Sequence, residues 1–232
     1  MIFRFQQFEV SHYRSTMQIG TDAVLLGGYL SRLIGNEENI FQILDIGTGC
    51  GVIALIAAQK IPNSEITAID IDENSVLEAT ENFSNSKWNI KLKAEHTSLQ
   101  ELTKENKSTF DLIISNPPYF ENSLKSGNQF KDMARHNDSL PFNVLALCTE
   151  KLLSKNGKFI CILPTVEARG FIRTALIEGL FCNQIVEIFS KENDSSPKRM
   201  IMVFQKKKEE RIVERFVIGD EVYKDIVNDL LI

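Results

Sequence analysis

Short apolar runs rich in β-branched residues alternate with segments of helical periodicity along most of this 232-residue chain. The clearest run, at residues 110–115, reads F-D-L-I-I-S, and a similar run at 43–46 precedes a glycine-rich turn. Runs of this length and composition are typical of buried parallel strands. We therefore predict strands at residues 43–46, 65–71, within 90–96, and at 110–115, 158–163, 181–189 and 200–205.

The segments between the runs predict helices at residues 21–33, 52–59, 73–83, 140–153 and 166–178. Thr21 or Asp22 is a candidate N-cap for the first helix, and Asn156-Gly157 is expected to end the fourth. A short strand or ribbon is expected near the beginning, and a small strand–helix unit at the end.

This alternation specifies an α/β fold with a mostly parallel sheet, in which two later strands close one edge. The length suits a single domain over residues 1–232. We divide it into an N-terminal extension at 1–40, a core at 41–205 and a C-terminal strand–helix ending at 206–232.

The run at 110–115 stops at a stiff polar tip, Asn116-Pro117-Pro118-Tyr119. Open α/β sheets bind their ligands at the carboxyl ends of strands, which is where this tip stands. An asparagine side chain and a carbonyl locked by proline can accept both hydrogens of a planar –NH2 group. A phenol ring can stack on the ring that carries the amine. The alternative is an ordinary strand-ending turn.

A glycine loop with an acid at the preceding strand end, D-x-G-x-G-x-G, follows the run at 43–46 and supplies Asp45, Gly47, Gly49 and Gly51. Such a loop lets the backbone approach a ligand closely, and its spacing differs from the dinucleotide fingerprint G-x-G-x-x-G. Asp45 can meet a cationic amino group. Asp70, at the end of the next strand, is a candidate partner for ribose hydroxyls, whereas Asp72 can equally cap the following helix.

Other candidate contacts with the cofactor or substrate lie outside the glycine loop and the N-P-P-Y tip. Thr21 and Asp22 either cap their helix or fold over the cofactor pocket. The long polar stretch at 120–141 is either a solvated loop or a recognition loop. Basic residues that could meet phosphates stand there and elsewhere, namely Arg14, Lys125, Lys131, Arg135, Lys198 and Arg199.

Composition limits the class of protein. The formal net charge of −5 gives no support to nucleic-acid binding, because dedicated binders are often strongly basic. The cysteines Cys50, Cys148, Cys161 and Cys182 form no C-x-x-C pair, which predicts reduced thiols and no metal site. The start lacks a secretory signal, and the longest apolar run, at 52–58, is too short to span a membrane. We expect a cytoplasmic protein.

N-P-P-Y after an apolar strand resembles the catalytic motif of the amino-methyltransferases that use S-adenosylmethionine. Together, F-x-Q-F-E-V, M-Q-I-G-T-D-A-V-L-L-G, L-D-I-G-T-G-C-G, D-L-I-I-S-N-P-P-Y-F and A-R-H resemble one family in the same order. This is the bacterial tRNA (adenine-N6) methyltransferase family that modifies the adenine following the anticodon of valine tRNA. The G-T-D segment is the discriminating piece.

The resemblance implies a seven-stranded class I methyltransferase sheet with helices on both faces and a last strand that runs antiparallel. It implies S-adenosylmethionine as cofactor, tRNA as partner, and no metal, membrane or obligate protein partner. Thr21, Asp22, Asp45, Gly47, Gly49, Gly51, Asp70 and Asn116 would then hold the cofactor. Ser98 stands where the family's adenine-binding acid is usual. Asn116, Pro117, Pro118 and Tyr119 would act on the amine.

Other functions remain open on sequence grounds. The same chemistry could serve guanine N2 of ribosomal RNA, adenine in DNA, or glutamine N5 of a protein. A non-catalytic cofactor-binding protein or RNA chaperone is a different class, which the intact Asp45, Asp70 and N-P-P-Y motif disfavour. A dehydrogenase would need the other glycine spacing.

Overall fold

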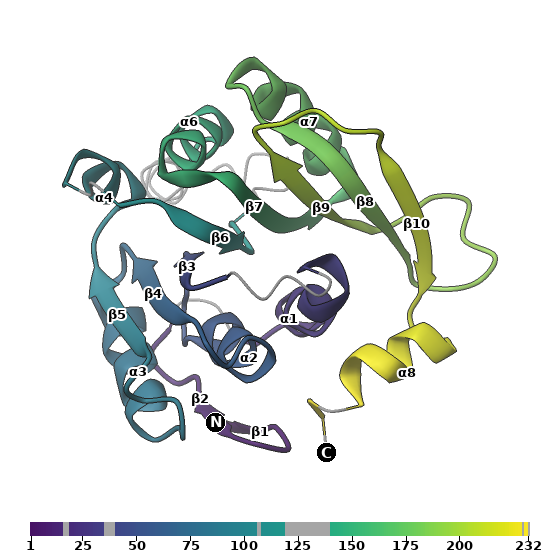
Figure 1. Ribbon diagram of the computed structural model, residues 1–232. Coiled ribbons are helices and arrows are strands. Elements are labelled where there is room, and N and C mark those ends of the chain that lie inside the picture. Colours follow the sequence, from purple (N-terminus) through teal and green to yellow (C-terminus); the bar gives the residue numbers. More distant parts are fainter. Residues whose placement is uncertain (16–18, 35–39, 106–107, 119–139, 229, 232) are drawn as a thin grey trace, which may run out of the picture.

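The computed structural model describes residues 1–15, 19–34, 40–105, 108–118, 140–228 and 230–231. Its centre is an eight-stranded sheet in the order β10-β8-β9-β7-β6-β3-β4-β5 (Figure 1). The strands are β3 (Gln42–Ile46), β4 (Glu65–Asp70), β5 (Leu92–His96), β6 (Phe110–Ser115), β7 (Leu153–Pro164), β8 (Phe181–Phe189), β9 (Arg199–Gln205) and β10 (Ile212–Val217). All seven predicted strands are present.

The strand directions follow one pattern with one exception. β9 runs antiparallel to both of its neighbours, β7 and β8, and every other pairing in the sheet is parallel. The eighth strand, β10, corrects the expected count of seven. It lies parallel to the outer edge of β8, so part of the expected C-terminal ending belongs to the sheet.

Helices cover both faces of the sheet (Figure 1). One face carries α1 (Thr21–Ile34), α2 (Val52–Lys60), α3 (Glu73–Ser84) and α8 (Glu221–Val227). The other carries α4 (Leu99–Glu105), α6 (Phe142–Leu152) and α7 (Thr165–Ile177). Adjacent strand residues divide between the two cores: Leu112 and Ile114 face the first, and Ile113 faces the second. Burial on both sides explains why the strands read as continuous apolar runs.

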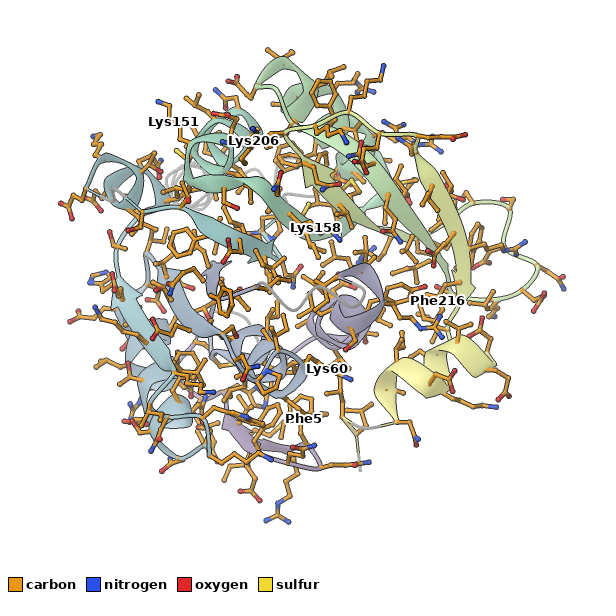
Figure 2. The ribbon with its side chains drawn as sticks, in the orientation of Figure 1. Phe5, Lys60, Lys151, Lys158, Lys206 and Phe216 are labelled. Atoms are coloured by element: carbon orange, nitrogen blue, oxygen red, sulfur yellow. The ribbon has the colours of Figure 1, made fainter. Side chains whose placement is uncertain are left out.

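The start and end of the chain pack together on the first face. β1 (Ile2–Arg4) and β2 (Glu9–Ser11) form the expected antiparallel ribbon, and Phe5 pairs with Leu231 in an isolated bridge. Phe216 of β10 packs between Tyr29 of α1 and Tyr223 of α8 (Figure 2). Phe216 is 1% exposed, so β10 is attached to the fold by an aromatic anchor as well as by its pairing with β8.

Asn156-Gly157 does not end a helix as predicted. α6 stops at Leu152, and β7 begins at once and contains both residues. The pairing of β7 with β6 shifts register between Phe110 and Leu112, because Phe110 pairs with Leu153 and Leu112 with Lys158. A Cβ on Gly157 would lie 2.9 Å from the carbonyl oxygen of Phe110, so the strand needs a glycine at this close approach.

None of the helices in the described residues is long and apolar enough to cross a membrane.

The turn from β3 into α2 depends on a glycine that packs against α3. Gly51 has φ +85°, and a Cβ there would lie 2.5 Å from the ring of Phe83. Gly49 also has a positive φ, +54°, but nothing lies within 4 Å of its hypothetical Cβ. Gly51 is therefore constrained both by its positive φ and by its contact with Phe83, whereas Gly49 is constrained only by its positive φ.

We expect Gly51→Ala to lower the free energy of unfolding by about 3 kcal/mol, because backbone strain and overpacking add. The matched control, Gly49→Ala, should lose only about 1 kcal/mol from strain alone. Denaturant unfolding of both variants measures the difference. Equal losses would show that contact with Phe83 contributes nothing.

Candidate active site

The glycine loop stands at the carboxyl end of β3, where it is tied to the neighbouring strand. The amides of Gly47 and Thr48 donate to the carbonyl of Ile69 at 2.9 and 3.0 Å. The amide of Gly49 donates to Asp70 Oδ2 at 2.8 Å. Nothing lies within 4 Å of the hypothetical Cβ atoms of Gly47 or Gly49, so a ligand can approach this backbone closely.

Asp70 fixes the loop with one carboxylate oxygen and the start of α3 with the other. Its Oδ1 accepts from the amide of Asp72 at 3.0 Å. Burial raises the pKa of Asp70, although these backbone hydrogen bonds oppose the rise. Asp72 is the N-cap of α3 and accepts from the amide of Ser75 at 2.9 Å. Of the two roles considered for Asp72, the structure shows the cap.

Asp45 is a carboxylate with no solvent exposure beneath the loop. Its Oδ2 accepts from the hydroxyl of Thr48 at 2.6 Å. Its Oδ1 is buried and has no hydrogen-bond partner in the described part of the chain. Burial raises the pKa of Asp45 to about 7, and the nearby charge of Asp70 adds to the rise. A buried acceptor in this state fits a ligand that brings an N–H donor.

Asn116 leaves β6 beside the glycine loop. The parallel register pairs Ser115 with Ile46, and the hydroxyl of Ser115 donates to the carbonyl of Ile46 at 2.9 Å. The Oδ1 of Asn116 is buried and lacks a hydrogen-bond partner among the residues that the structure covers. Pro117 is buried after it. Tyr119 lies outside the described residues.

Asn116 opens into a cavity of about 570 Å³. Five of the predicted site residues line it together, namely Thr21, Asp22, Asn116, Lys198 and Arg199. They come from the start of α1, the end of β6 and the segment that leads into β9. The sequence reading missed the remaining lining residues, which are Gly20, Leu25, Ile188, Ser190 and Ile218. Ile188 and Ser190 stand at the carboxyl end of β8, and this position was the available signal.

Asp22 and Arg199 form an ion pair across this cavity. Arg199 Nε lies 2.8 Å from Asp22 Oδ2, and the two side chains are 31% and 19% exposed. α1 begins at Thr21, so Thr21 and Asp22 lie in its first turn instead of before it. Asp22 therefore serves a tertiary contact, in addition to standing where a helix start favours an acid.

Several predicted residues lie elsewhere. Arg14 forms an ion pair with Glu81 of α3 at 2.7 Å and is not among the residues that line the cavity. Ser98 forms a capping box with Glu101, because its hydroxyl accepts from the amide of Glu101 at 3.1 Å and its own amide donates to Glu101 Oε2. Lys125, Lys131 and Arg135 fall outside the described residues.

Metal ligands do not gather here. The described residues contain no group of three or more histidine, cysteine or acidic side chains arranged to hold a metal ion. The four cysteines are buried and unpaired by disulfides, and burial raises the pKa of the Cys50 thiol to about 12. The site thus consists of carboxylates, an amide and exposed loop backbone.

Comparison with known proteins relates the chain to methyltransferases. Residues 29–139 match the model of the methyltransferase small domain family. A tRNA1(Val) (adenine(37)-N6)-methyltransferase of Christiangramia forsetii is 36% identical over 98% of this chain and 96% of its own length. A protein of the same name from Trichodesmium erythraeum is 40% identical over 89% of this chain and 84% of its own length.

Solved structures agree on the fold. A predicted O-methyltransferase from Agrobacterium tumefaciens superposes with a TM-score of 0.67 at 16% identity, covering 90% of this chain and 96% of its own. The fold is that of the class I methyltransferases, with β9 as the antiparallel strand and β10 as an addition. By sequence similarity over nearly its whole length, the chain belongs to the tRNA1(Val) (adenine(37)-N6)-methyltransferase family.

Proposed function

We propose that this protein transfers a methyl group from S-adenosylmethionine to the exocyclic N6 amine of an adenine in tRNA, at the position following the anticodon of valine tRNA. The observation that carries the proposal is the buried Oδ1 of Asn116, which lacks a partner among the described residues, on a residue that lines the cavity. The family relatives carry this activity in their names. We further propose that the chain works as one domain in the cytoplasm, without an obligate protein partner.

The glycine loop and its neighbours fit the cofactor. Open space above Gly47 and Gly49 leaves room for it, and Asp70 stands at the end of β4, where ribose hydroxyls are held in related sheets. The unpartnered Oδ1 of Asp45 suits the cationic amino group of the methionine portion. When bound, S-adenosylmethionine supplies an electrophilic methyl group on a sulfonium.

Asn116 and Pro117 act on the amine. An aromatic amine is a poor nucleophile, because its lone pair is delocalised into the ring. Asn116 Oδ1 and the Pro117 carbonyl accept its two hydrogens and favour a pyramidal nitrogen whose lone pair points toward the methyl group. Catalysis then rests on alignment and on these dipoles, which stabilise positive charge that develops on the nitrogen. The proton leaves afterwards to water or through the site. Pro118 stiffens the tip, and Tyr119 stacks on the unstacked base.

RNA is held by cations near this cavity in our proposal. Lys198 is exposed and Arg199 half-buried at the cavity wall. Lys125, Lys131 and Arg135, which follow the N-P-P-Y tip in sequence, are further proposed RNA contacts. Arg14 is a more distant candidate, since its guanidinium already pairs with Glu81. Ser98 stays a proposed adenine contact only if it gives up part of its capping box.

The direct test is transfer of labelled methyl from S-adenosylmethionine to unmodified bulk tRNA, followed by nucleoside analysis. We expect label as N6-methyladenosine in valine tRNA. A tRNA carrying guanine in place of the target adenine is the matched control and should stay unlabelled. Label in ribosomal RNA, DNA or protein glutamine, and none in tRNA, would refute the substrate while retaining amine methylation.

Asn116→Ala should lower the turnover number about 10²–10³-fold, because it removes one acceptor from the reacting amine. Its dissociation constant for S-adenosylhomocysteine should stay within about threefold of wild type. Asp70→Ala should do the reverse and weaken binding about tenfold or more, since a buried charged hydrogen bond is lost. Calorimetry and steady-state kinetics separate the two effects, and equal losses in both variants would contradict these roles.

Cofactor affinity should depend on pH through Asp45, whose pKa burial raises to about 7. Below this pH the carboxyl is protonated and cannot pair with a cationic amino group, so affinity for S-adenosylhomocysteine should fall by up to about tenfold per pH unit. Above it the affinity should level off. Titration calorimetry at intervals of about one pH unit, from about pH 5.5 to about pH 8.5, measures this pH dependence of the affinity. Asp45→Asn should bind weakly without this dependence.

A further inference from the structure

Two buried polar residues one turn apart on α3 hold the N-terminal segment 11–15. Glu78 and Asn82 are 1% and 4% exposed. As i,i+4 neighbours they lie on the same face of the helix. Burial of such groups is costly unless their hydrogen bonds are made, so their partners show what this face of α3 holds.

Glu78 is surrounded by consecutive backbone N–H groups. Its Oε1 accepts from the amides of Tyr13 and Arg14 at 2.5 and 3.1 Å, and its Oε2 accepts from the amide of Ser15 at 2.8 Å. The hydroxyl of Ser11 adds a fourth contact at 3.2 Å. Successive amides around an anion form a nest. Burial opposes ionisation of Glu78, but these hydrogen bonds outweigh it and lower its pKa.

Asn82 joins the same segment to the glycine loop. Its Oδ1 accepts from the amide of Ser11 at 2.9 Å, and its Nδ2 donates to the carbonyl of Ser11 at 2.9 Å. The same Nδ2 donates to the carbonyl of Cys50 at 2.8 Å. One side-chain amide therefore spans the end of β2 and the loop that carries Gly47 and Gly49. Two acceptors at the nitrogen and one donor at the oxygen fix its orientation.

The held segment leads toward the cavity. After residue 15 the chain reaches Gly20 and Thr21, which line the cavity together with Asn116. We propose that Glu78 and Asn82 are positioning residues: they hold residues 11–15 against the glycine loop and thereby set the affinity for the cofactor. The identity of that cofactor rests on the proposed function. Neither residue contacts the cavity, so both act through the segment and the loop.

The first test is binding of S-adenosylhomocysteine to the full chain by calorimetry. Asn82→Ala removes three hydrogen bonds and should weaken binding about tenfold, with the turnover number at saturating cofactor within about threefold of wild type. Ser84→Ala is the matched control on the same helix, because Ser84 is exposed and its hydroxyl donates to the carbonyl of Thr80 within α3, and it should bind within about twofold of wild type. If Asn82→Ala does not fold, Asn82→Asp replaces it, since it keeps the acceptor for Ser11 and loses both donated bonds.

The second test is amide hydrogen exchange in Glu78→Gln, without cofactor. Exchange at Tyr13, Arg14 and Ser15 should accelerate at least about tenfold, while amides of β3 and β6 keep their wild-type rates. The proposal is overturned if these amides loosen and affinity for S-adenosylhomocysteine does not change, or if Ser84→Ala loses as much affinity as Asn82→Ala. Wild-type protein that binds no S-adenosylhomocysteine would refute the proposed cofactor itself, and exchange would then decide only whether Glu78 holds the segment.

Discussion

The parallel pairing of β3 with β4 and β6 is the constraint on which the site depends. Ile46 stands opposite Ile69 on one side and Ser115 on the other. The three strands therefore end within one residue of the same level, and the next residue of each strand lies beside those of its neighbours. Asp70, Gly47 and Asn116 are these residues. A shift of one position in either pairing would turn alternate side chains to the opposite face and separate the carboxylate from the loop it holds.

The same edge of the sheet contains two buried oxygens that the described part of the fold does not satisfy, Asp45 Oδ1 and Asn116 Oδ1. Leaving an acceptor unpaired in a core costs on the order of 1–3 kcal/mol, and folded proteins rarely tolerate it without a reason. Asn116 Oδ1 accepts, and Asp45 Oδ1 accepts when its carboxyl is ionised, so both favour ligands rich in N–H groups. An amino acid-like cofactor at one oxygen and an aromatic amine at the other would satisfy these two acceptors, which is why the proposed reaction is consistent with them.

Structural features that depend on residues close in sequence could be predicted from the sequence. Features that depend on contacts between residues far apart in sequence could not. The positions of the seven strands, the glycine loop between strand and helix, and the place of Asp70 at a strand end can be predicted from local sequence. The register shift beside Gly157 depends on the close approach of Gly157 to Phe110, and the place of β10 in the sheet depends on its long-range pairing with β8. The capping box of Ser98 follows the local pattern S-x-x-E at residues 98–101, which is a sequence signal for a helix start. The buried roles of Glu78 and Asn82 gave no signal, because a polar residue in an amphipathic helix is normally solvated.

The formal net charge of −5 opposes binding of RNA, because RNA phosphates are also negative. Screening limits the reach of surface carboxylates to about 8 Å at physiological ionic strength, so the cations near the cavity matter more than the sum over the chain. Asp22 offsets part of this local charge by pairing with Arg199. The two side chains are less than a third exposed, so this pair is screened less than an ion pair at the surface. In our proposal an RNA phosphate competes with Asp22 for the guanidinium of Arg199, which the ion pair positions at the cavity wall.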